Sequence, residues 1–291
     1  SRRTPYDSCR VRYLDGGHRG RPGAHSLAGP GGSFRVGKPD AFPLLSSLTK
    51  LFSEERKLIY GTRISAFACS ALALALVTSP ATGQDADRSV ADGGISVPGW
   101  MGKIDARAAA SGQDIEDSKL SMDGEVLHVM TGPAVTYWNA ANSVSDDYMI
   151  KATFHEPQYM NLNGHPHPYG IIFGGNDLRT DSQSYLYCAA YGNGSFIVHG
   201  FGPDPFQMNG RRAEANDAVN KAAAQGEPVT QEIAVSAMGD KVECAINGTV
   251  VASYDRSEIV TTGKLKSTDG MYGIRFAHNT EATVSGLTVT R

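Results

Sequence analysis

Residues 183–201 read QSYLYCAAYGNGSFIVHGF, two apolar and aromatic runs joined by Gly-Asn-Gly. Asn and Gly readily adopt the positive φ angles that a two-residue type I′ hairpin turn requires. We therefore expect a hairpin that turns at Asn193 and Gly194 and pairs Tyr191 with Phe196. In this register one face carries Tyr185, Tyr187, Tyr191 and Phe196, and the other carries Leu186, Cys188, Ala190, Ile197, His199 and Phe201. Both faces are largely apolar, which predicts two strands at the centre of a sandwich.

A second hairpin is predicted at residues 240–254, DKVECAINGTVVASY, where Asn-Gly again supplies the turn. A two-residue loop at this position places Ile246 opposite Thr249 and Cys244 opposite Val251. Apolar and polar residues alternate on both sides of the turn, so one face of this hairpin is expected to be buried.

Short runs rich in Val, Ile, Tyr, Phe and Thr recur along the chain, separated by Gly, Asn, Asp and Pro. This pattern is typical of β-sandwiches and barrels. We expect strands at residues 125–130, 134–138, 148–155, 169–173, 184–191, 195–201, 229–238, 241–246, 249–254, 271–276 and 282–289. Residues 211–225 (RRAEANDAVNKAAAQ) form the helix candidate. The predicted fold class is all-β, a two-sheet antiparallel jelly-roll sandwich.

The N-terminal part of the chain has a different composition. Residues 1–83 contain 12 Lys and Arg against 5 Asp and Glu, a net +7, so the whole-chain charge of -3 leaves -10 for residues 84–291. Residues 1–45 are rich in Arg, Gly, Pro and Ser and show no periodicity, and a disordered basic leader is predicted at residues 1–56. Such a leader could bind nucleic acid, but its composition and the lack of Met before Met101 favour a mis-set start. The acidic remainder predicts no nucleic-acid partner.

An export signal is predicted at residues 57–83. Basic residues precede the uncharged run ISAFACSALALALV at residues 64–77, and small residues follow it, which is the order of a secretory signal peptide. The run is shorter than the ~20 residues that a membrane-spanning helix needs. Cleavage after Gly83 or after Ala81 fits the pattern, and Gly83 is preferred.

After cleavage we expect a linker at residues 84–98 and one domain at residues 99–291, in a secreted or periplasmic protein with no stable membrane span. Two cysteines remain, Cys188 and Cys244. Export permits a disulfide between them. Two free buried thiols are the alternative, because Cys also behaves as a small hydrophobic residue.

Several motifs together resemble one family. They are Gly99-Trp100, MDGEVLHVM (122–130), YGIIFGG (169–175), the hairpins of residues 183–201 and 240–254, and the closing GMYGIRFAHNTEATVSGLTVTR (270–291). The chain is similar to the secreted concanavalin A-like jelly rolls labelled 3-keto-disaccharide hydrolase domains, formerly a domain of unknown function. The resemblance implies an exported, carbohydrate-directed protein that hydrolyses a 3-keto-glycoside. Residues 165–175, HPHPYGIIFGG, depart from the family's Asn-Ser-Gly-type segment.

The glucanase relatives of this fold carry their carboxylates as E-x-D-x-E or E-x-D-x-x-E on one strand, where an acid and a nucleophile flank the glycosidic bond. No predicted strand carries that set, so a retaining glucanase is not expected. The alternative to an enzyme is a non-catalytic, laminin-G-like carbohydrate-binding or surface-interaction module.

Histidines provide the candidate metal site. His165 and His167 flank Pro166, which keeps the segment extended, so the two imidazoles can point the same way. Together with His155 they are candidate ligands of a divalent metal that would polarise a carbonyl or activate water. The alternative is a Pro-stiffened polar loop at the edge of the sheet.

Tyrosines provide the candidate carbohydrate site. Tyr185, Tyr187 and Tyr191 alternate along one predicted strand and could form a flat platform on which a sugar ring stacks. The alternative is that they are buried core aromatics.

Four polar residues near strand ends are further candidates. Asp177 and Arg179 follow the predicted strand at 169–173, where they could donate and accept hydrogen bonds with a carbohydrate or glycoside ligand. His278 and Asn279 lie where the last predicted hairpin turns. Either pair could instead simply solvate a loop.

Overall fold

The computed structural model describes residues 86–162 and 164–291. The predicted leader (1–56) and signal peptide (57–83) lie outside the described residues. The two α-helices of the described part are short, α1 (Ala106–Ala110) and α2 (Arg256–Ile259), and a 3-10 turn spans Ile115–Asp117. None of these helices is long and apolar enough to cross a membrane.

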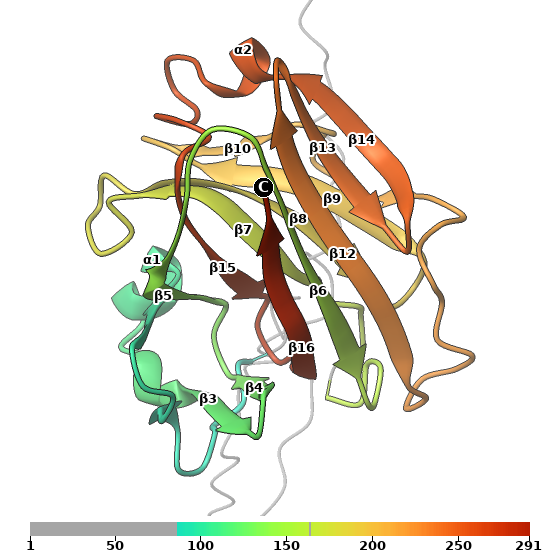
Figure 1. Cartoon of the computed structure of the whole chain (residues 1–291). Helices are drawn as coiled ribbons and strands as arrows, with labels where there is room; N and C mark the ends of the chain where they lie inside the picture. The colour runs from blue at the N-terminus through green and yellow to red at the C-terminus, as the bar shows by residue number, and fades with distance from the viewer. Residues whose placement is uncertain (1–85, 163) are drawn as a thin grey trace, which may run out of the picture. The chain divides into compact units, whose positions relative to one another are not determined.

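Two sheets lie face to face, as the layers in Figure 1 show. The first contains, in spatial order, β1 (Gly94–Ile95), β3 (Ser118–Asp123), β4 (Val126–Thr131), β16 (Glu281–Thr290), β6 (Tyr148–Glu156), β12 (Val229–Met238), β13 (Lys241–Ile246) and β14 (Thr249–Asp255). The second contains β10 (Pro205–Gln207), β9 (Ser195–Phe201), β8 (Ser184–Tyr191), β7 (Tyr169–Asn176), β15 (Gly270–Phe276), β5 (Val135–Val144) and β2 (Trp100–Ile104), with β11 (Glu214–Ala215) paired to β9. All pairs except β1–β3 are antiparallel, which confirms the predicted two-sheet sandwich.

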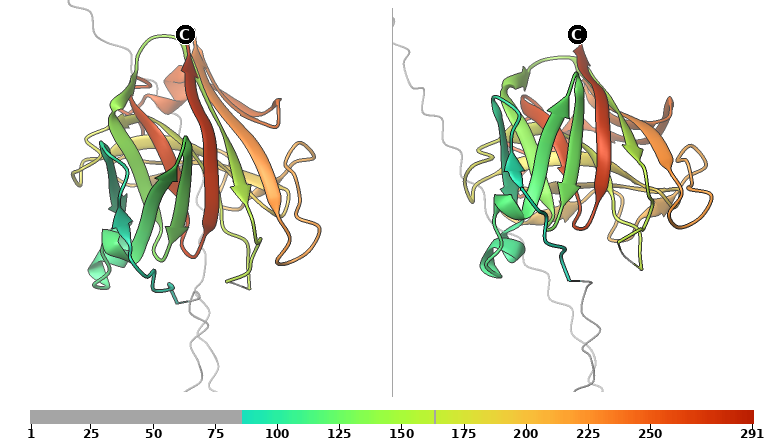
Figure 2. Two further views of the ribbon diagram at one scale, coloured as in Figure 1. Left: turned by 60° about the horizontal axis from the view of Figure 1, so that its bottom comes forward. Right: turned by 90° about the horizontal axis from the view of Figure 1, so that it is seen from below.

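Both ends of the described part join the first sheet, β16 in its middle and β1 at its edge. Figure 2 shows the C-terminal strand β16 lying inside this sheet, between β4 and β6. Part of the segment expected to be a linker also joins the sheet, because β1 pairs with β3. The sequence patterns predicted none of β1, β2 and β3.

The main core lies between the sheets, where period-two alternation directs the apolar side chains. Along β6, Ile150, Ala152 and Phe154 are buried, whereas Lys151 and Thr153, which alternate with them, are more exposed. β7 is apolar on both faces: Ile171 belongs to the main core, and Ile172 belongs to a second, smaller cluster. Because adjacent residues of a strand face opposite ways, this second cluster lies on the outer face of the second sheet.

The β13–β14 hairpin has the predicted turn. Asn247 and Gly248 have φ angles of 49° and 80°, as a type I′ turn requires, and Ile246 pairs with Thr249. The prediction for Cys244 is wrong, because a bulge after this residue places it opposite Ala252 instead of Val251. A bulge inserts one extra residue on one strand and shifts the pairing beyond it.

The β8–β9 hairpin has a three-residue loop, so the predicted register is wrong by one residue. Tyr191 pairs with Ser195, and Phe196 lies opposite Ala190. A shift by one residue moves every side chain of a strand to the other face. Phe196 therefore belongs to the main core, whereas Ile197 joins the outer cluster with the tyrosines of β8.

The predicted helix at residues 211–225 does not form. Glu214 and Ala215 pair with β9 as β11, and the Ala222 N–H donates to the Gly192 carbonyl at 2.8 Å. Helix propensity is worth only tenths of a kcal/mol per residue. Backbone hydrogen bonds to the hairpin and burial of Val219 outweigh it.

A disulfide joins the two sheets. Cys188 lies on β8 and Cys244 on β13, their Cα atoms are 5.9 Å apart, and the two are bonded. Of the two alternatives left open by the sequence, the structure has the disulfide. The bridge closes a loop of 56 residues.

We predict that the double variant C188A/C244A unfolds at a lower urea concentration than the oxidised wild type. The chain-entropy model gives a loss of about 4 kcal/mol for a loop of this length. Urea denaturation followed by tryptophan fluorescence measures this loss. An unchanged midpoint in the double variant would contradict the cross-link.

Candidate functional site

The segment before β7 runs beside the segment after β15. These strands pair with Tyr169 opposite Phe276, and the pairing continues outward because the Ala277 N–H donates to the Pro168 carbonyl at 2.9 Å. The next position in the same register places His167 next to His278. Two histidines from distant parts of the sequence are thus brought together by a backbone ladder.

Three imidazoles meet at this point. Nε2 of His165 and Nε2 of His167 are 2.8 Å apart, and the ring centres of His167 and His278 are 4.0 Å apart. One nitrogen of each of the three rings lies within 4.8 Å of the other two. His165 is exposed, His167 is buried and His278 is half-buried, so solvent reaches the group from one side.

A carboxylate orients the third imidazole. Asn279, in the left-handed region with φ 54°, accepts the Arg88 N–H at 2.7 Å and donates to the Ala86 carbonyl at 3.0 Å. These bonds hold Asp87 against the turn, where its Oδ1 accepts a hydrogen bond from His278 Nδ1 at 2.7 Å. This contact sets the tautomer of the ring and directs the lone pair to Nε2.

His155 is not part of the group. It lies on the outer face of the first sheet, and its Nδ1 is 2.9 Å from the Thr230 hydroxyl. Strand alternation causes this placement, because the residues on either side of His155 face the sandwich interior. The structure therefore groups His165 and His167 with His278 instead of His155.

The sequence showed His278 only as a polar residue at a turn. A signal for its role exists, since it follows the strand at 271–276 as closely as His167 precedes the strand at 169–173. That signal becomes informative only when the pairing of these two strands is known.

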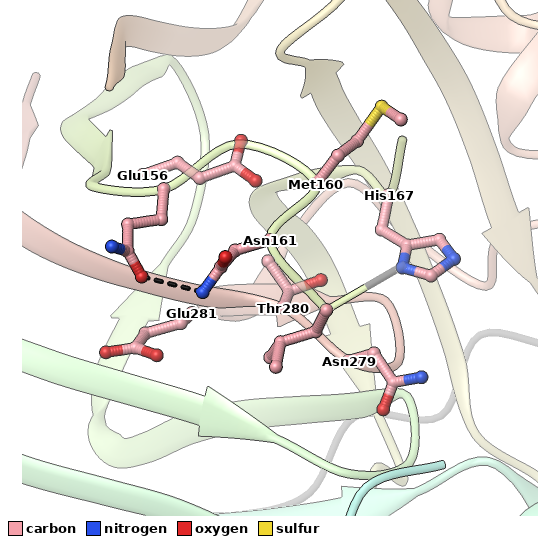
Figure 3. Close-up of a pocket in the computed structure, with 9 residues that line it drawn as sticks. Glu156, Met160, Asn161, His167, Asn279, Thr280 and Glu281 are labelled. Carbon is pink, nitrogen blue, oxygen red and sulfur yellow. Dashed lines mark hydrogen bonds between the residues drawn. The ribbon is translucent and has the colours of Figure 1, made fainter. Parts of the chain in front are cut away.

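His167 also borders a small pocket of about 20 Å³ at the same end of the sandwich. In Figure 3, His167 and Asn279 lie at one end of this pocket and Glu156 at the other. Glu156 is 6% exposed, and its Oε2 has no hydrogen-bond partner among the described residues. Burial raises the pKa of the Glu156 carboxyl to about 7, although the Met160 N–H opposes the rise.

The tyrosine row lies on the outer face of the second sheet, as alternation along β8 requires. Tyr185 is only 1% exposed and its hydroxyl is 2.9 Å from the Thr136 hydroxyl, so its ring offers no open stacking surface. Tyr187 is 9% exposed and Tyr191 is half-buried. The row is thus a packed cluster, in contrast to the open platform expected from the sequence.

A buried arginine lies within this cluster. Arg275 of β15 is 8% exposed, and its guanidinium donates two hydrogen bonds to Asp105, at 2.9 and 2.7 Å. It also lies over the rings of Tyr187 and Phe201, 5.1 and 4.9 Å from their centres. A planar guanidinium can form a bidentate ion pair and stack on aromatic rings at the same time.

An open hollow of about 300 Å³ adjoins Asp105 and the histidine group. Its polar lining consists of Asp87, Asp105, Arg107, Ser111, Gln113 and His278. Asp105 precedes α1 but makes no capping bond, because its carboxylate is bound to Arg275. Arg107 and Gln113 are supplied by α1 and the turn after it, so both hydrogen-bond donors and acceptors face the hollow.

Asp177 and Arg179 belong to neither group. Both are exposed; Asp177 forms an ion pair with Lys266, and Arg179 donates to the sulfur of Met101. These contacts attach the loop after β7 to its neighbours.

Comparison with known proteins gives matches at the level of structure alone. Carbohydrate binding module CBM66 from Bacillus subtilis has a TM-score of 0.45 and 8% identity, over 68% of this chain and 98% of that one. An endo-β-1,3-glucanase from Pyrococcus furiosus has a TM-score of 0.45 and 10% identity, over 65% and 87%. Sheep galectin-11 has a TM-score of 0.33 and 11% identity, over 51% and 93%.

No family model and no curated protein sequence matches the chain. The resemblance to 3-keto-disaccharide hydrolase domains stays a prediction from the sequence, and the fold assignment rests on the strand order and register described above.

We predict that Asp105→Ala destabilises the domain by about 2–3 kcal/mol, because it leaves the Arg275 guanidinium buried without its carboxylate. Removing one partner of a fully buried ion pair costs more, about 3–5 kcal/mol of stability. The smaller value is expected here because the Asp105 side chain is 31% exposed. Urea denaturation at pH 7 measures the loss. The matched control is Asp181→Ala. The Asp181 carboxylate is fully exposed and lies 3.9 Å from Lys103, so its removal should leave the urea midpoint unchanged. Equal losses in both variants would show that the Asp105–Arg275 ion pair has no special role in stability.

We predict a pH-dependent stability difference between the wild type and Glu156→Gln. Because the folded-state pKa of Glu156 is raised from 4.5 to about 7, its contribution to stability is present below pH 4.5 and is lost as the pH rises towards 7. Relative to E156Q, the wild type should lose about 2–3 kcal/mol across this window. Urea denaturation of both proteins at pH 4.5, 6 and 7.5 tests this, and parallel pH profiles would show that the carboxyl does not titrate in this range.

Proposed function

We propose that this domain is an exported, carbohydrate-directed protein that binds a saccharide in the hollow beside α1. The observation that carries the proposal is the lining of this hollow, where a carboxylate, a guanidinium, an amide and a hydroxyl converge around a volume of about 300 Å³. Ligand pockets typically measure about 300–1,000 Å³ and fix their ligand with a few placed polar groups.

The chemistry of the lining suits a polyhydroxylated ligand. Each sugar hydroxyl both donates and accepts hydrogen bonds, and the hollow presents acceptors on Asp105 and donors on Arg107 and Gln113. Ala108 and Ala134 add an apolar wall on which the CH groups of a sugar ring can lie. Asp105 is held in place by Arg275, so a ligand would meet a preorganised acceptor.

Hydrolysis of a glycoside is the second candidate, and the His278–Asp87 pair favours it. An imidazole whose Nδ1 donates to a carboxylate is held in one tautomer with its second nitrogen available for acid–base or metal chemistry. The pair lines the same hollow, and the family that the sequence resembles is labelled as 3-keto-disaccharide hydrolase domains. A non-catalytic, laminin-G-like module would bind a saccharide in the hollow without turning it over.

The disulfide supports the export part of the proposal. Disulfides persist in oxidising compartments such as the periplasm or the extracellular medium and are rare in the cytosol. The Cys188–Cys244 bond therefore agrees with the signal peptide predicted at residues 57–83.

We predict that Arg107→Ala weakens saccharide binding about tenfold or more, because a charge-assisted hydrogen bond contributes about 1.5–3 kcal/mol. A glycan array probed with the full chain selects the saccharide, and calorimetry measures its affinity. Arg179→Ala, an exposed arginine outside the hollow, is the control and should bind like the wild type.

The proposal fails if the array shows no binding, or if Arg179→Ala loses affinity and Arg107→Ala does not. Incubation of the selected saccharide as its glycoside, followed by mass spectrometry of the products, separates the two candidates. Cleavage supports the hydrolase, and intact glycoside supports the binding module.

A further inference from the structure

We propose that His165, His167 and His278 bind a divalent transition-metal ion of the zinc class, with Asp87 orienting one of the ligands. Neutral imidazole is a preferred ligand of zinc and its neighbours. The structure brings one nitrogen from each of the three rings to within 4.8 Å of the others, although the rings come from two separate segments.

The nitrogens are close enough that small side-chain movements would place them around a tetrahedral ion. Zinc–nitrogen bonds of about 2.0–2.1 Å place two ligand nitrogens about 3.4 Å apart at the tetrahedral angle. Nε2 of His165 and Nε2 of His167 are 2.8 Å apart, so metal binding requires them to separate by a few tenths of an ångström. His165 is exposed, so its side chain has room for this movement.

Asp87 supplies the outer contact that ligand histidines usually have. Metal-binding imidazoles almost always donate their second N–H to a carboxylate, a carbonyl or water, which fixes the ring and raises its basicity. His278 donates its Nδ1–H to Asp87 at 2.7 Å, leaving Nε2 as the ligand atom. Asp87 is itself held by the bonds of Asn279 to the segment on either side of it.

Paired backbone supports two of the three ligands. His167 and His278 lie two residues beyond the ends of β7 and β15, where the Ala277–Pro168 hydrogen bond continues the ladder. Three protein ligands also leave the fourth position of a tetrahedral ion for water or a ligand, as in catalytic zinc sites.

The rival account is that the three rings are a structural cluster, held by stacking and by a hydrogen bond between neutral imidazoles. Stability does not separate the two accounts, because either one allows a ring to be removed with a small or a large effect on folding. The two accounts differ in what they predict for metal binding. Only the metal-site account predicts a tight metal affinity that falls when any one of the three rings, or Asp87, is removed.

The test is a titration of the chelator-treated full chain with Co²⁺, followed by the visible absorption of the bound ion, and then competition with Zn²⁺. We expect one ion per chain, with absorption typical of tetrahedral cobalt. His165→Ala, at an exposed position, should weaken metal binding at least 100-fold with little effect on folding. His278→Ala should weaken metal binding by at least the same factor. Asp87→Asn should weaken it about 10–100-fold, the usual effect of losing an outer-shell partner.

His155→Ala is the matched control, because His155 is hydrogen-bonded on the outer face of the first sheet and should bind cobalt like the wild type. Thermal denaturation without metal verifies that each variant is folded. The proposal is overturned if the wild type binds no Co²⁺ or Zn²⁺ in the micromolar range, or if His165→Ala binds as tightly as His155→Ala. Since metal alone is the probe, this outcome is independent of saccharide binding in the hollow.

Discussion

The backbone ladder between β7 and β15 is the constraint on which the rest of the molecule depends. It joins strands that are far apart in the sequence at the centre of the second sheet. Its neighbour β8 approaches so closely that a Cβ at Gly170 would lie 1.9 Å from the Cys188 carbonyl oxygen, so only glycine fits there. The end of this ladder holds His167 and His278, and its interior carries Arg275 opposite Gly170.

The N-terminal segment of the domain completes both polar groups. The Asp105 carboxylate neutralises the Arg275 guanidinium on β15. The Asp87 carboxylate orients the His278 imidazole in the turn after β15. A buried guanidinium without a partner is costly, and docking of the segment removes that cost. The same docking forms the hollow, because α1 follows Asp105 directly. Stability and the candidate ligand site therefore depend on the same contacts.

Local patterns predicted most of the strands. The bounds of β8, β9, β12 and β13 agree with the predicted runs, because alternation of apolar side chains is a property of each strand alone. The failures come from contacts with other segments. Residues 211–225 have helical propensity, yet they bond to the β8–β9 hairpin, and the loop of that hairpin is one residue longer than Asn-Gly alone indicates. The short strands β1 and β2 have too few residues for a clear period.

The sequence by itself determined the all-β sandwich, the Asn-Gly turn at 247–248 and the face of β8 that carries the tyrosines, since each follows from side-chain periodicity or turn geometry within one short segment. Tertiary structure alone decided which strands are neighbours. For that reason His165 and His167 could be recognised as a pair, but their grouping with His278 and Asp87, and the separation of His155, could not. Hydrogen bonds between strands can form in many combinations, and only the packing of the whole sandwich selects one of them.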